Sequence, residues 1–249
     1  MENFSENAKQ EKKTALVTGA SSGIGLAVSL KLIQNGYIVY GIGRNFRQEE
    51  ENVRKILQNN SFHPVILDMT DTVGLSREII KIREKVEIDV LVNNAGAGYF
   101  GPHEELNDKK IEEMTQINLA VPMIVTQMLL RDLKKRKGYV FFISSVTARK
   151  TNTHGCAYGA TKAGLTSFAV SLFEEVRKYG VKVTVLHPDM TRSKFYRNAD
   201  FCEGDLSDTY LECGEIAETV SALLDQREGL VITDITIRPQ RHQIQKKKN

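Results

Sequence analysis

The sequence predicts an α/β fold: a doubly wound sheet of about seven parallel strands, covered by helices on both faces to give three layers in a single domain. Three observations lead to this expectation. Short β-branched runs alternate along the chain with longer stretches of helical periodicity. A glycine-rich turn follows the first run, as where a strand leads into a helix. No Pro/Gly-rich linker or change in composition divides the 249 residues into two parts.

Composition and charge restrict the class of protein. With 41% hydrophobic and 26% charged residues, the chain can bury a sizeable core, which excludes a disordered or collagen-like protein. The 34 basic and 31 acidic residues leave a formal net charge of only +3, so no nucleic-acid partner is expected. No apolar run reaches the ~18 residues of a membrane span, and the N-terminus is too polar for a signal peptide. The three cysteines, Cys156, Cys202 and Cys213, form no CxxC pair. We therefore expect a cytoplasmic protein without a disulfide framework.

Seven strands are predicted from short runs rich in β-branched, aromatic and other apolar residues. In chain order they cover 14–18, 37–42, 65–67, 89–92, 139–143, 181–186 and 230–237. Helical periodicity connects them, from Leu26 to Asn35 after the first strand and then at about 72–86, 108–134, 156–179 and 214–226. The segment from about 189 to 213 lacks periodicity and mixes polar with aromatic residues, which is typical of a mobile loop over a site.

The two ends of the chain are expected to lie outside the α/β domain, which covers residues 13–239. Residues 1–12 are almost entirely polar and are predicted to form a flexible arm. Residues 240–249 are a basic tail, which could contact nucleic acid or anionic lipid but is expected to be a solvated terminus.

A phosphate-binding turn is predicted between the first strand and the first helix. The chain there reads Thr-Gly-Ala-Ser-Ser-Gly-Ile-Gly over residues 18–25. Glycines allow the backbone to approach a pyrophosphate, whose charge then meets the free N–H groups at the positive end of the helix. Three glycines in eight residues could also be an ordinary turn, but their place between a strand and a helix favours nucleotide binding.

The end of the second strand indicates which nucleotide this would be. An acidic residue usually stands there and accepts a hydrogen bond from a ribose 2′-hydroxyl, whereas this chain has Gly43 followed by Arg44. A guanidinium suits a 2′-phosphate, so the sequence favours NADP(H) over NAD(H), unless Arg44 is only a solvated side chain. Asp68, after the third strand, could accept from an adenine amino group or cap a helix. Asn93-Asn94-Ala95-Gly96 closes the fourth strand at the same sheet edge, as the floor of a nucleotide site or as a polar turn.

A second group of residues indicates proton chemistry. Tyr158 and Lys162 are four residues apart and therefore share one face of a predicted helix. A nearby ammonium favours the phenolate and lowers the pKa of a tyrosine toward neutrality. Ser145, after the fifth strand, could hydrogen-bond a carbonyl oxygen beside Tyr158, and Ser144 is its rival. Asn118 is unfavourable inside a helix, which indicates either a functional role or a buried, satisfied amide.

In order and spacing, these motifs resemble the short-chain dehydrogenase/reductase family, from about residue 12 to about residue 237. The resemblance implies a single Rossmann-type domain that oxidises an alcohol or reduces a carbonyl with NAD(P). It implies that Tyr158 is the acid/base, that Lys162 lowers its pKa and holds the nicotinamide ribose, and that Ser145 steadies the substrate oxygen. Asn118 would anchor a water in the proton relay. Relatives of this kind are commonly homodimers or homotetramers through the helices near 108–134 and 156–179.

The resemblance also implies which residues contact the cofactor, for which NADP(H) is favoured. These residues are Gly19, Ser21, Ser22, Ile24, Arg44, Asp68, Met69, Asn94, Ala95, Gly96, Tyr158, Lys162, Pro188, Thr191 and Ser193. No metal site is expected, because the five histidines show no ligand spacing.

The chain departs from the family pattern after the sixth strand. His187-Pro188-Asp189 stands where the family usually has Pro-Gly, so a carboxylate lies near the nicotinamide and could bias substrate charge or face water. The ending Ile235 to Pro239 resembles a branch that includes dehydrogenases of small 3-hydroxy acids. His154 and Cys156 precede Tyr158 and could line the substrate pocket or have no chemical role.

The sequence thus predicts an NADP(H)-dependent oxidoreductase acting on a carbonyl or secondary alcohol. Two alternatives stay open at this point: a dinucleotide-binding sensor or scaffold without turnover, and a 3-hydroxy acid dehydrogenase or 3-oxoacyl reductase of the same family. An intact set of Asn118, Ser145, Tyr158 and Lys162 argues against the sensor, which needs no proton relay.

Overall fold

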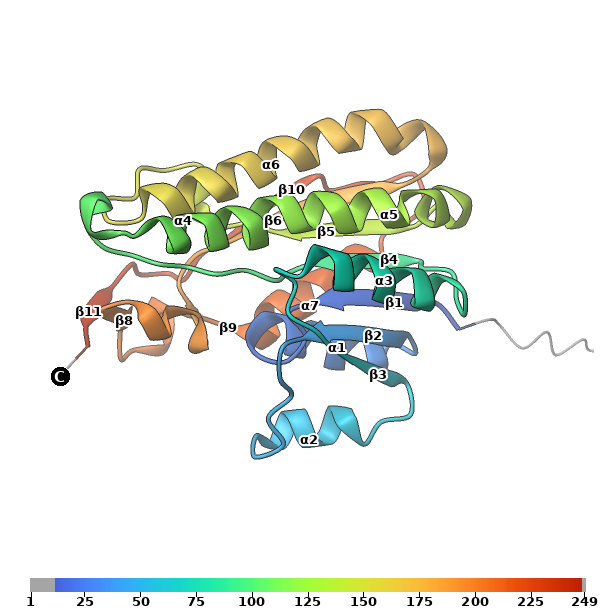
Figure 1. The fold of residues 1–249 in the computed structure, drawn as a ribbon, viewed down its shortest axis with the longest axis horizontal. Coiled ribbons are helices and arrows are strands. Elements are labelled where there is room, and N and C mark those ends of the chain that lie inside the picture. Colours follow the sequence, from blue (N-terminus) through green and yellow to red (C-terminus); the bar gives the residue numbers. More distant parts are fainter. Residues whose placement is uncertain (1–11, 248–249) are drawn as a thin grey trace, which may run out of the picture.

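The structure is a computed structural model that describes residues 12–247, and the predicted arm at residues 1–11 lies outside this range. Its centre is a seven-stranded sheet in the order β10-β6-β5-β4-β1-β2-β3, in which every pair of neighbours is parallel (Figure 1). The strands are β1 Thr14–Thr18, β2 Ile38–Gly43, β3 Phe62–Ile66, β4 Val90–Asn93, β5 Tyr139–Ile143, β6 Lys182–Pro188 and β10 Asp234–Ile237. The predicted fold class, a Rossmann-type doubly wound sheet, is confirmed.

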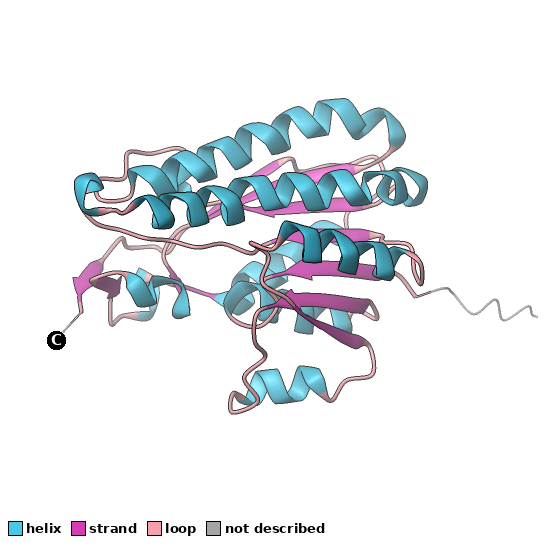
Figure 2. Ribbon diagram, viewed as in Figure 1, coloured by secondary structure: helices cyan, strands magenta, loops and turns pink. Residues whose placement is uncertain are grey.

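Helices cover both faces of this sheet (Figure 2). On one face, an apolar core joins α3 (Thr72–Arg83), α5 (Val121–Arg136) and α6 (Cys156–Val176) to the strands. On the other, a second core joins α1 (Gly23–Gln34), α2 (Glu51–Leu57) and α7 (Cys213–Leu224) to the strands. Alternate residues of β1 belong to the two cores, which is why strands buried on both faces are continuously apolar. Within residues 12–247, no helix is long and apolar enough to cross a membrane.

The long helical region predicted at 108–134 is interrupted. It consists of α4 (Asp108–Thr115), a π-helical turn (Gln116–Ala120) and α5. One extra residue per turn re-aims the side chains that follow, and such turns are found mostly at functional sites. The interruption falls on Asn118, whose place inside a helix was the unfavourable feature of the sequence.

Other elements were missed or differ in length. Helix α2 was not predicted, because its seven residues are too few for a periodic pattern. The last strand of the sheet, β10, begins four residues later than predicted. The segment predicted as a loop contains the short elements β7 (Thr191–Arg192), η5 (Lys194–Asn198), β8 (Phe201–Glu203), η6 (Ser207–Thr209) and β9 (Leu211–Glu212).

The described part of the C-terminal tail is largely exposed but contains regular structure. Residues Ile244–Lys246 form a strand, β11, that pairs antiparallel with β8. The two strands lie at the end of the molecule on the left of Figure 1, beside the segment that was predicted to cover the site. Isolated tail residues have no periodicity of their own, so only a partner strand far away in sequence gives them a fixed conformation.

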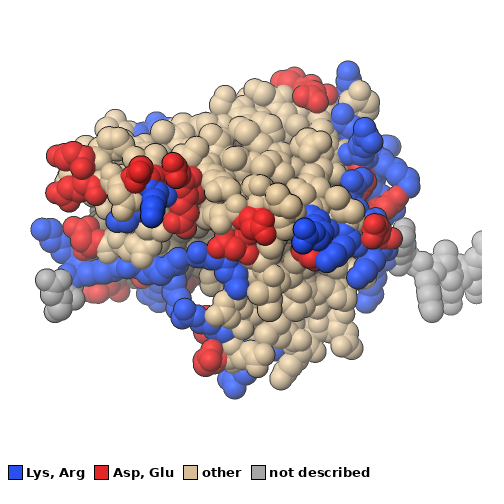
Figure 3. All heavy atoms as spheres, in the orientation of Figure 1, with Lys and Arg blue, Asp and Glu red and all other residues tan. Residues whose placement is uncertain are grey.

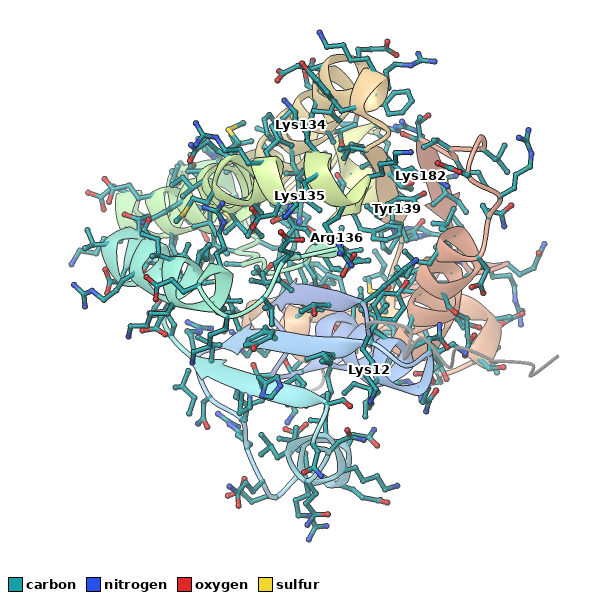
Figure 4. All side chains as sticks on the ribbon, turned by 90° about the vertical axis from the view of Figure 1, so that its right-hand side faces the viewer. Lys12, Lys134, Lys135, Arg136, Tyr139 and Lys182 are labelled. Atoms are coloured by element: carbon teal, nitrogen blue, oxygen red, sulfur yellow. The ribbon has the colours of Figure 1, made fainter. Side chains whose placement is uncertain are left out.

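Basic side chains gather at the opposite edge, where the sheet strands begin (Figure 4). There Asp89 is buried and accepts from the backbone N–H of Thr14 through Oδ2 at 2.8 Å. Its Oδ1 accepts from Arg136 Nε, also at 2.8 Å. Asp89 therefore joins the beginning of β1 to the C-terminal end of α5, far from the edge that carries the predicted site.

Replacing Asp89 tests this anchor. We expect Asp89→Ala to lower the free energy of unfolding by about 2–3 kcal/mol, because a buried backbone N–H and an adjacent guanidinium lose their acceptor. Urea denaturation followed by circular dichroism measures the change. The matched control is Glu87→Ala, which removes exposed ion pairs with Lys135 and Arg136 and is expected to cost less than about 1 kcal/mol. Equal losses in the two variants would contradict the role of Asp89.

Candidate active site

One pocket lies at the carboxyl edge of the sheet and encloses about 1170 Å³, counted to its open mouth. Every residue predicted to contact the cofactor lines it, from the glycine-rich turn through the ends of β2, β4 and β6 to the start of α6. Ser145 lines the same pocket, whereas Asn118 is fully buried behind it. Parallel strands place their carboxyl ends at one edge, which is how residues from the whole chain meet here.

The turn between β1 and α1 is shaped for close backbone approach. Gly19 and Gly23 have φ values of +68° and +56°, where side chains are strained. A Cβ atom at Gly25 would lie 2.2 Å from the Gly19 carbonyl oxygen. The N-cap residue of α1, Ser22, makes no side-chain capping bond, and the first turn of the helix has no acidic residue. The N–H groups at this helix end are therefore left to an anionic ligand.

Asn94 holds that turn in place from β4. Its Nδ2 donates to the carbonyl oxygens of Thr18 at 2.9 Å and Gly19 at 3.3 Å. Thr18 Oγ1 in turn accepts from the backbone N–H groups of Asn94 and Ala95, each at 3.0 Å. Asn93 differs, because its side chain is buried and donates to Thr126 Oγ1 at 3.1 Å, outside the pocket lining. Of the two adjacent amides, only Asn94 belongs to the site.

The end of β2 carries a positive charge into the pocket. Arg44 is exposed, lines the pocket and has no carboxylate within 4.0 Å among residues 12–247. A Cβ atom at Gly43 would lie 2.8 Å from Ser21 Oγ, so a carboxylate side chain there would collide with the glycine-rich turn. Together, a free helix end, a glycine cradle and an unpaired guanidinium fit a phosphorylated dinucleotide.

Asp68 lies on the same side of the pocket as Arg44. The backbone N–H of Thr70 is the main cause that lowers the pKa of the Asp68 carboxyl, with the Thr70 hydroxyl and the charge of Arg44 as further causes. Asp68 is not a helix cap, since Asp71 occupies that position in α3 and accepts from the Gly74 N–H at 2.9 Å. Asp68 is thus an ionised, exposed acceptor at the pocket wall.

Helix α6 and the end of β5 bring the proton-chemistry residues together. The Ser145 side chain lies near enough to the Tyr158 hydroxyl to oppose the rise of its pKa, and Ser145 Oγ accepts from the Thr147 N–H at 3.2 Å. Lys162 Nζ lies 5.9 Å from the centroid of the Tyr158 ring and donates to the Ile143 carbonyl oxygen at 2.8 Å. The rival of Ser145, Ser144, contacts Thr166 Oγ1 and the Lys162 carbonyl oxygen instead. The predicted trio of Ser145, Tyr158 and Lys162 is therefore one constellation.

Burial dominates the electrostatics of this trio. Desolvation raises the pKa of Tyr158 above its ordinary value, and the nearby Ser145 side chain opposes the shift. Desolvation also lowers the pKa of Lys162 to about 8. The sequence argument expected the ammonium to lower the tyrosine pKa, but loss of water around the ring is the larger effect in this structure.

Asn118 connects the loop after β4 to α6. Its Nδ2 donates to the Ala97 carbonyl oxygen at 2.9 Å and to Thr161 Oγ1 at 3.0 Å, while its Oδ1 accepts from the Ala97 N–H at 2.8 Å. The π-helical turn aims this amide inward from the junction of α4 and α5. Its Oδ1 and Lys162 Nζ both lie beside Gly96, at 3.2 and 3.6 Å from the position of an added Cβ.

The comparisons with known proteins agree with this geometry. The family model for short chain dehydrogenases matches residues 13–201. The chain belongs to the short-chain dehydrogenase family. It is therefore an oxidoreductase of the kind that acts on CH–OH groups.

Three similar proteins illustrate the range of this family. The chain is 34% identical over 192 residues to a 3-oxoacyl-[acyl-carrier-protein] reductase of Buchnera aphidicola, covering 76% of this chain and 78% of the relative. It is 30% identical over 234 residues to a serine 3-dehydrogenase of Rhizobium radiobacter, covering 91% and 93%. An alcohol dehydrogenase from the archaeon Thermococcus sibiricus, solved with 5-hydroxy-NADP, superposes with a TM-score of 0.83 at 26% identity and covers 94% of this chain and 99% of its own.

The sequence did not identify a cluster of aromatic rings beside Tyr158, which we call the aromatic wall; of its members, Phe195 and Tyr196 line the pocket of this dehydrogenase. Phe100 and Phe195 lie 5.4 and 5.6 Å from the Tyr158 ring, measured between centroids. Tyr196 contacts both of these phenylalanines, and Phe201 contacts Phe100 and Tyr196. Three of the four rings come from the segment without periodicity, whose aromatic content was the only signal.

His187 was also missed as a support of the site. Its ring is fully buried, with Nδ1 3.1 Å from the Ser145 carbonyl oxygen and Nε2 3.0 Å from Asp234 Oδ2. His187 thus ties the backbone of Ser145 to β10. By contrast, His154 and Cys156 are not among the residues that line the pocket.

Replacing Lys162 tests the cost of its burial. We expect Lys162→Met to raise the free energy of unfolding at pH 7 by about 1–3 kcal/mol, because folding must otherwise desolvate an ammonium. Between the folded pKa of about 8 and the ordinary value of 10.5, the unfolded chain binds more protons. The stability of the natural protein therefore rises across that window, and the advantage of the variant shrinks.

Urea denaturation at pH 7 and at pH 10 measures this difference. Lys85→Met is the matched control, since Lys85 is exposed and its removal is expected to change stability by less than about 0.5 kcal/mol at either pH. A Lys162→Met variant that is less stable than the natural protein at pH 7 would contradict the assignment of a costly buried charge.

Proposed function

We propose that the protein is an NADP(H)-dependent oxidoreductase that interconverts a carbonyl compound and its secondary alcohol, with Tyr158 as the acid/base. The observation that carries the proposal is that Ser145, Tyr158 and Lys162 come together inside the pocket that every predicted cofactor residue lines. The family and the NADP-type ligand of the Thermococcus sibiricus structure support it.

The residues that would hold the cofactor divide into two groups. The glycine-rich turn and the N-terminus of α1 would receive the pyrophosphate, and Arg44 the 2′-phosphate. Lys162, Pro188 and Thr191 would hold the nicotinamide end. When bound, the nicotinamide supplies or accepts the hydride.

Tyr158 and Ser145 would act on the substrate oxygen. Both side chains line the pocket near one another, so both could hydrogen-bond the same carbonyl oxygen. The raised pKa keeps the Tyr158 hydroxyl protonated at neutral pH, which suits donation to a carbonyl oxygen as negative charge develops there. Lys162 would favour the phenolate that remains, because an ammonium nearby stabilises it.

Asn118 would act indirectly, by fixing the backbone and the side chains next to Ser145, Tyr158 and Lys162. Its amide fixes the Ala97 backbone and Thr161, which is one residue before Lys162. The family resemblance adds a water-anchoring role in a proton relay. The two side chains beside Gly96, Asn118 and Lys162, are placed for such a chain of hydrogen bonds.

Removing the Tyr158 hydroxyl tests the acid/base role. Tyr158→Phe keeps the ring packed against Phe100 and Phe195, so we expect NADPH affinity to be retained while turnover falls by about 100-fold or more. The first measurement is the rate of single-turnover NADPH oxidation with a panel of ketones, 3-oxo acids and a 3-oxoacyl thioester. The second is the rate of NADP⁺ reduction with serine. Tyr179→Phe is the control, because Tyr179 is exposed and does not line the pocket. Equal rates for Tyr158→Phe and the natural protein would contradict the proposal.

The same panel separates the substrate classes within the family. Two relatives are named for a 3-oxoacyl substrate and for serine, and these compounds are included for that reason. Turnover of simple ketones alone would support the carbonyl reductase proposed here. Preference for the oxo or hydroxy acids would favour a 3-hydroxy acid dehydrogenase or a 3-oxoacyl reductase.

The preference for NADP(H) is tested at Arg44. We expect Arg44→Ala to weaken NADPH binding about 10- to 100-fold and to leave NADH binding nearly unchanged, because only NADPH carries the 2′-phosphate. Isothermal titration calorimetry with each nucleotide measures both affinities. Arg47→Ala is the matched control, since Arg47 is exposed on the same segment but does not line the pocket. An equal loss for NADPH and NADH would exclude a contact between Arg44 and a 2′-phosphate.

A further inference from the structure

The C-terminal segment makes a continuous series of contacts with the segment that covers the pocket, which we call the lid (residues 190–212). Arg241 donates from its backbone N–H to the Asp208 carbonyl oxygen at 2.8 Å and from Nε to Asp208 Oδ2 at 2.6 Å. Strand β11 then pairs with β8, in the register Ile244 to Glu203. Lys247 donates from its backbone N–H to the Asp200 carbonyl oxygen at 2.8 Å.

The last described residue, Lys247, also supports the lid helix η5 directly. Its Nζ donates to the carbonyl oxygen of Tyr196 at 2.6 Å and to that of Arg197 at 3.2 Å. These carbonyls lie at the C-terminal end of the 3₁₀ turn, where that of Tyr196 also accepts from the Ala199 N–H at 3.0 Å. A cation at this end is also favoured by the dipole of the turn.

The lid residues held in this way belong to the aromatic wall beside Tyr158. Tyr196 is partly buried, and burial raises the pKa of its hydroxyl. Phe201 belongs to β8 and pairs through its backbone with Lys246. Both rings contact Phe100, which packs against the Tyr158 ring. The tail therefore lies directly behind the aromatic wall.

Asp189 connects the tail to the sheet. Its carboxylate is largely buried at the pocket wall, next to the end of β6. Lys150 Nζ lies 3.6 Å from it, and Arg238 Nε and His242 Nδ1 each lie 4.0 Å from it. The unusual carboxylate thus faces three basic side chains, two of them from the C-terminal segment. On the left of Figure 3, where the lid and the tail lie, basic atoms form a band across this end of the molecule.

We propose that residues 238–247 are a specificity-determining strap: they hold Tyr196 and Phe201 against the substrate chamber, with Asp189 as the anchor at the sheet. The strap thereby limits the size of the carbonyl compound that reaches Tyr158. The proposal rests on the proposed function for its second part, since chamber size matters only if Tyr158 meets the substrate.

Few other contacts hold the middle of the lid. Strand β7 pairs with β9 at the two ends of the lid, and Lys194 forms an exposed ion pair with Glu50 at 2.5 Å. Between them, β8 pairs only with β11 among the described strands of residues 12–247. Removing β11 would leave β8 without a ladder partner, and a segment with few buried contacts and exposed hydrogen bonds opens locally.

The first part of the proposal, that the strap holds the lid in place, can be tested without any substrate by measuring how fast a protease cleaves the lid. Lys194 and Arg197 are trypsin sites inside the lid, and we expect deletion of residues 244–249 to accelerate cleavage at these sites about ten-fold or more. Lys247→Ala should accelerate it less, because the backbone pairing of β11 remains. Lys246→Ala is the matched control. It removes the same charge from the neighbouring residue, whose exposed side chain forms no hydrogen bond or ion pair within residues 12–247, and this variant should be cleaved at the natural rate.

Hydrogen exchange measured on the same variants separates local opening from unfolding. Amides of residues 195–203 should exchange about ten-fold faster after the deletion, while those of Val140–Phe142 in β5 keep their protection. Unchanged cleavage and exchange of the lid in the deletion variant would overturn the proposal. Loss of protection in β5 as well would show a general structural role and would overturn it too.

Substrate selectivity tests the second part. We expect the deletion and Asp189→Asn to raise the ratio of kcat/KM for a bulky ketone to that for a small ketone by about five-fold or more, whereas Lys246→Ala leaves it unchanged. A proportional change for both ketones would overturn the specificity role. Absence of turnover by the natural protein contradicts the proposed function and this second part, while the trypsin and exchange results still decide whether the tail supports the lid.

Discussion

Parallel pairing of the seven sheet strands is the constraint on which the rest of the structure depends. It turns the carboxyl ends of β1, β2, β4, β5 and β6 toward one edge, although these strands come from across most of the chain. The phosphate-type turn, Arg44 and the Ser145 backbone meet there for that reason. The opposite edge carries the structural anchor at Asp89, so stability and chemistry are separated along the strand direction.

At that edge, burial away from water affects the pKa values of Tyr158 and Lys162 more than the charge of the neighbouring side chain does. Desolvation moves the pKa of Tyr158 upward and that of Lys162 downward, which favours the neutral form of both. The site can hold a proton at Tyr158 and carries an amine that titrates near neutral pH. Preorganisation of this kind costs folding stability, since a buried amine is retained where an apolar side chain would pack at lower cost.

The lid shows how weak individual contacts can fix a functional segment when they act in series. The Lys247 contacts are exposed, so each contributes little free energy, and the ion pairs of Asp189 are long. Their arrangement matters more than their strength, because each joins the tail to a different part of the lid or to the sheet. Two features that seemed unrelated along the chain, the carboxylate at Asp189 and the basic C-terminus, are neighbours in the folded protein.

The sequence by itself determined the sheet, its seven strands and those pocket residues that follow the strands or belong to the glycine-rich turn, because strands buried on both faces and such a turn leave strong local patterns. It also singled out Asn118, which falls in a π-helical turn. Only the tertiary structure decided the direction of the Tyr158 pKa, the exclusion of Asn93 from the pocket, the support of Ser145 by His187, and the pairing of the tail with the lid. Each of these depends on burial or on contacts between residues distant in sequence, and neither leaves a periodic pattern in the chain.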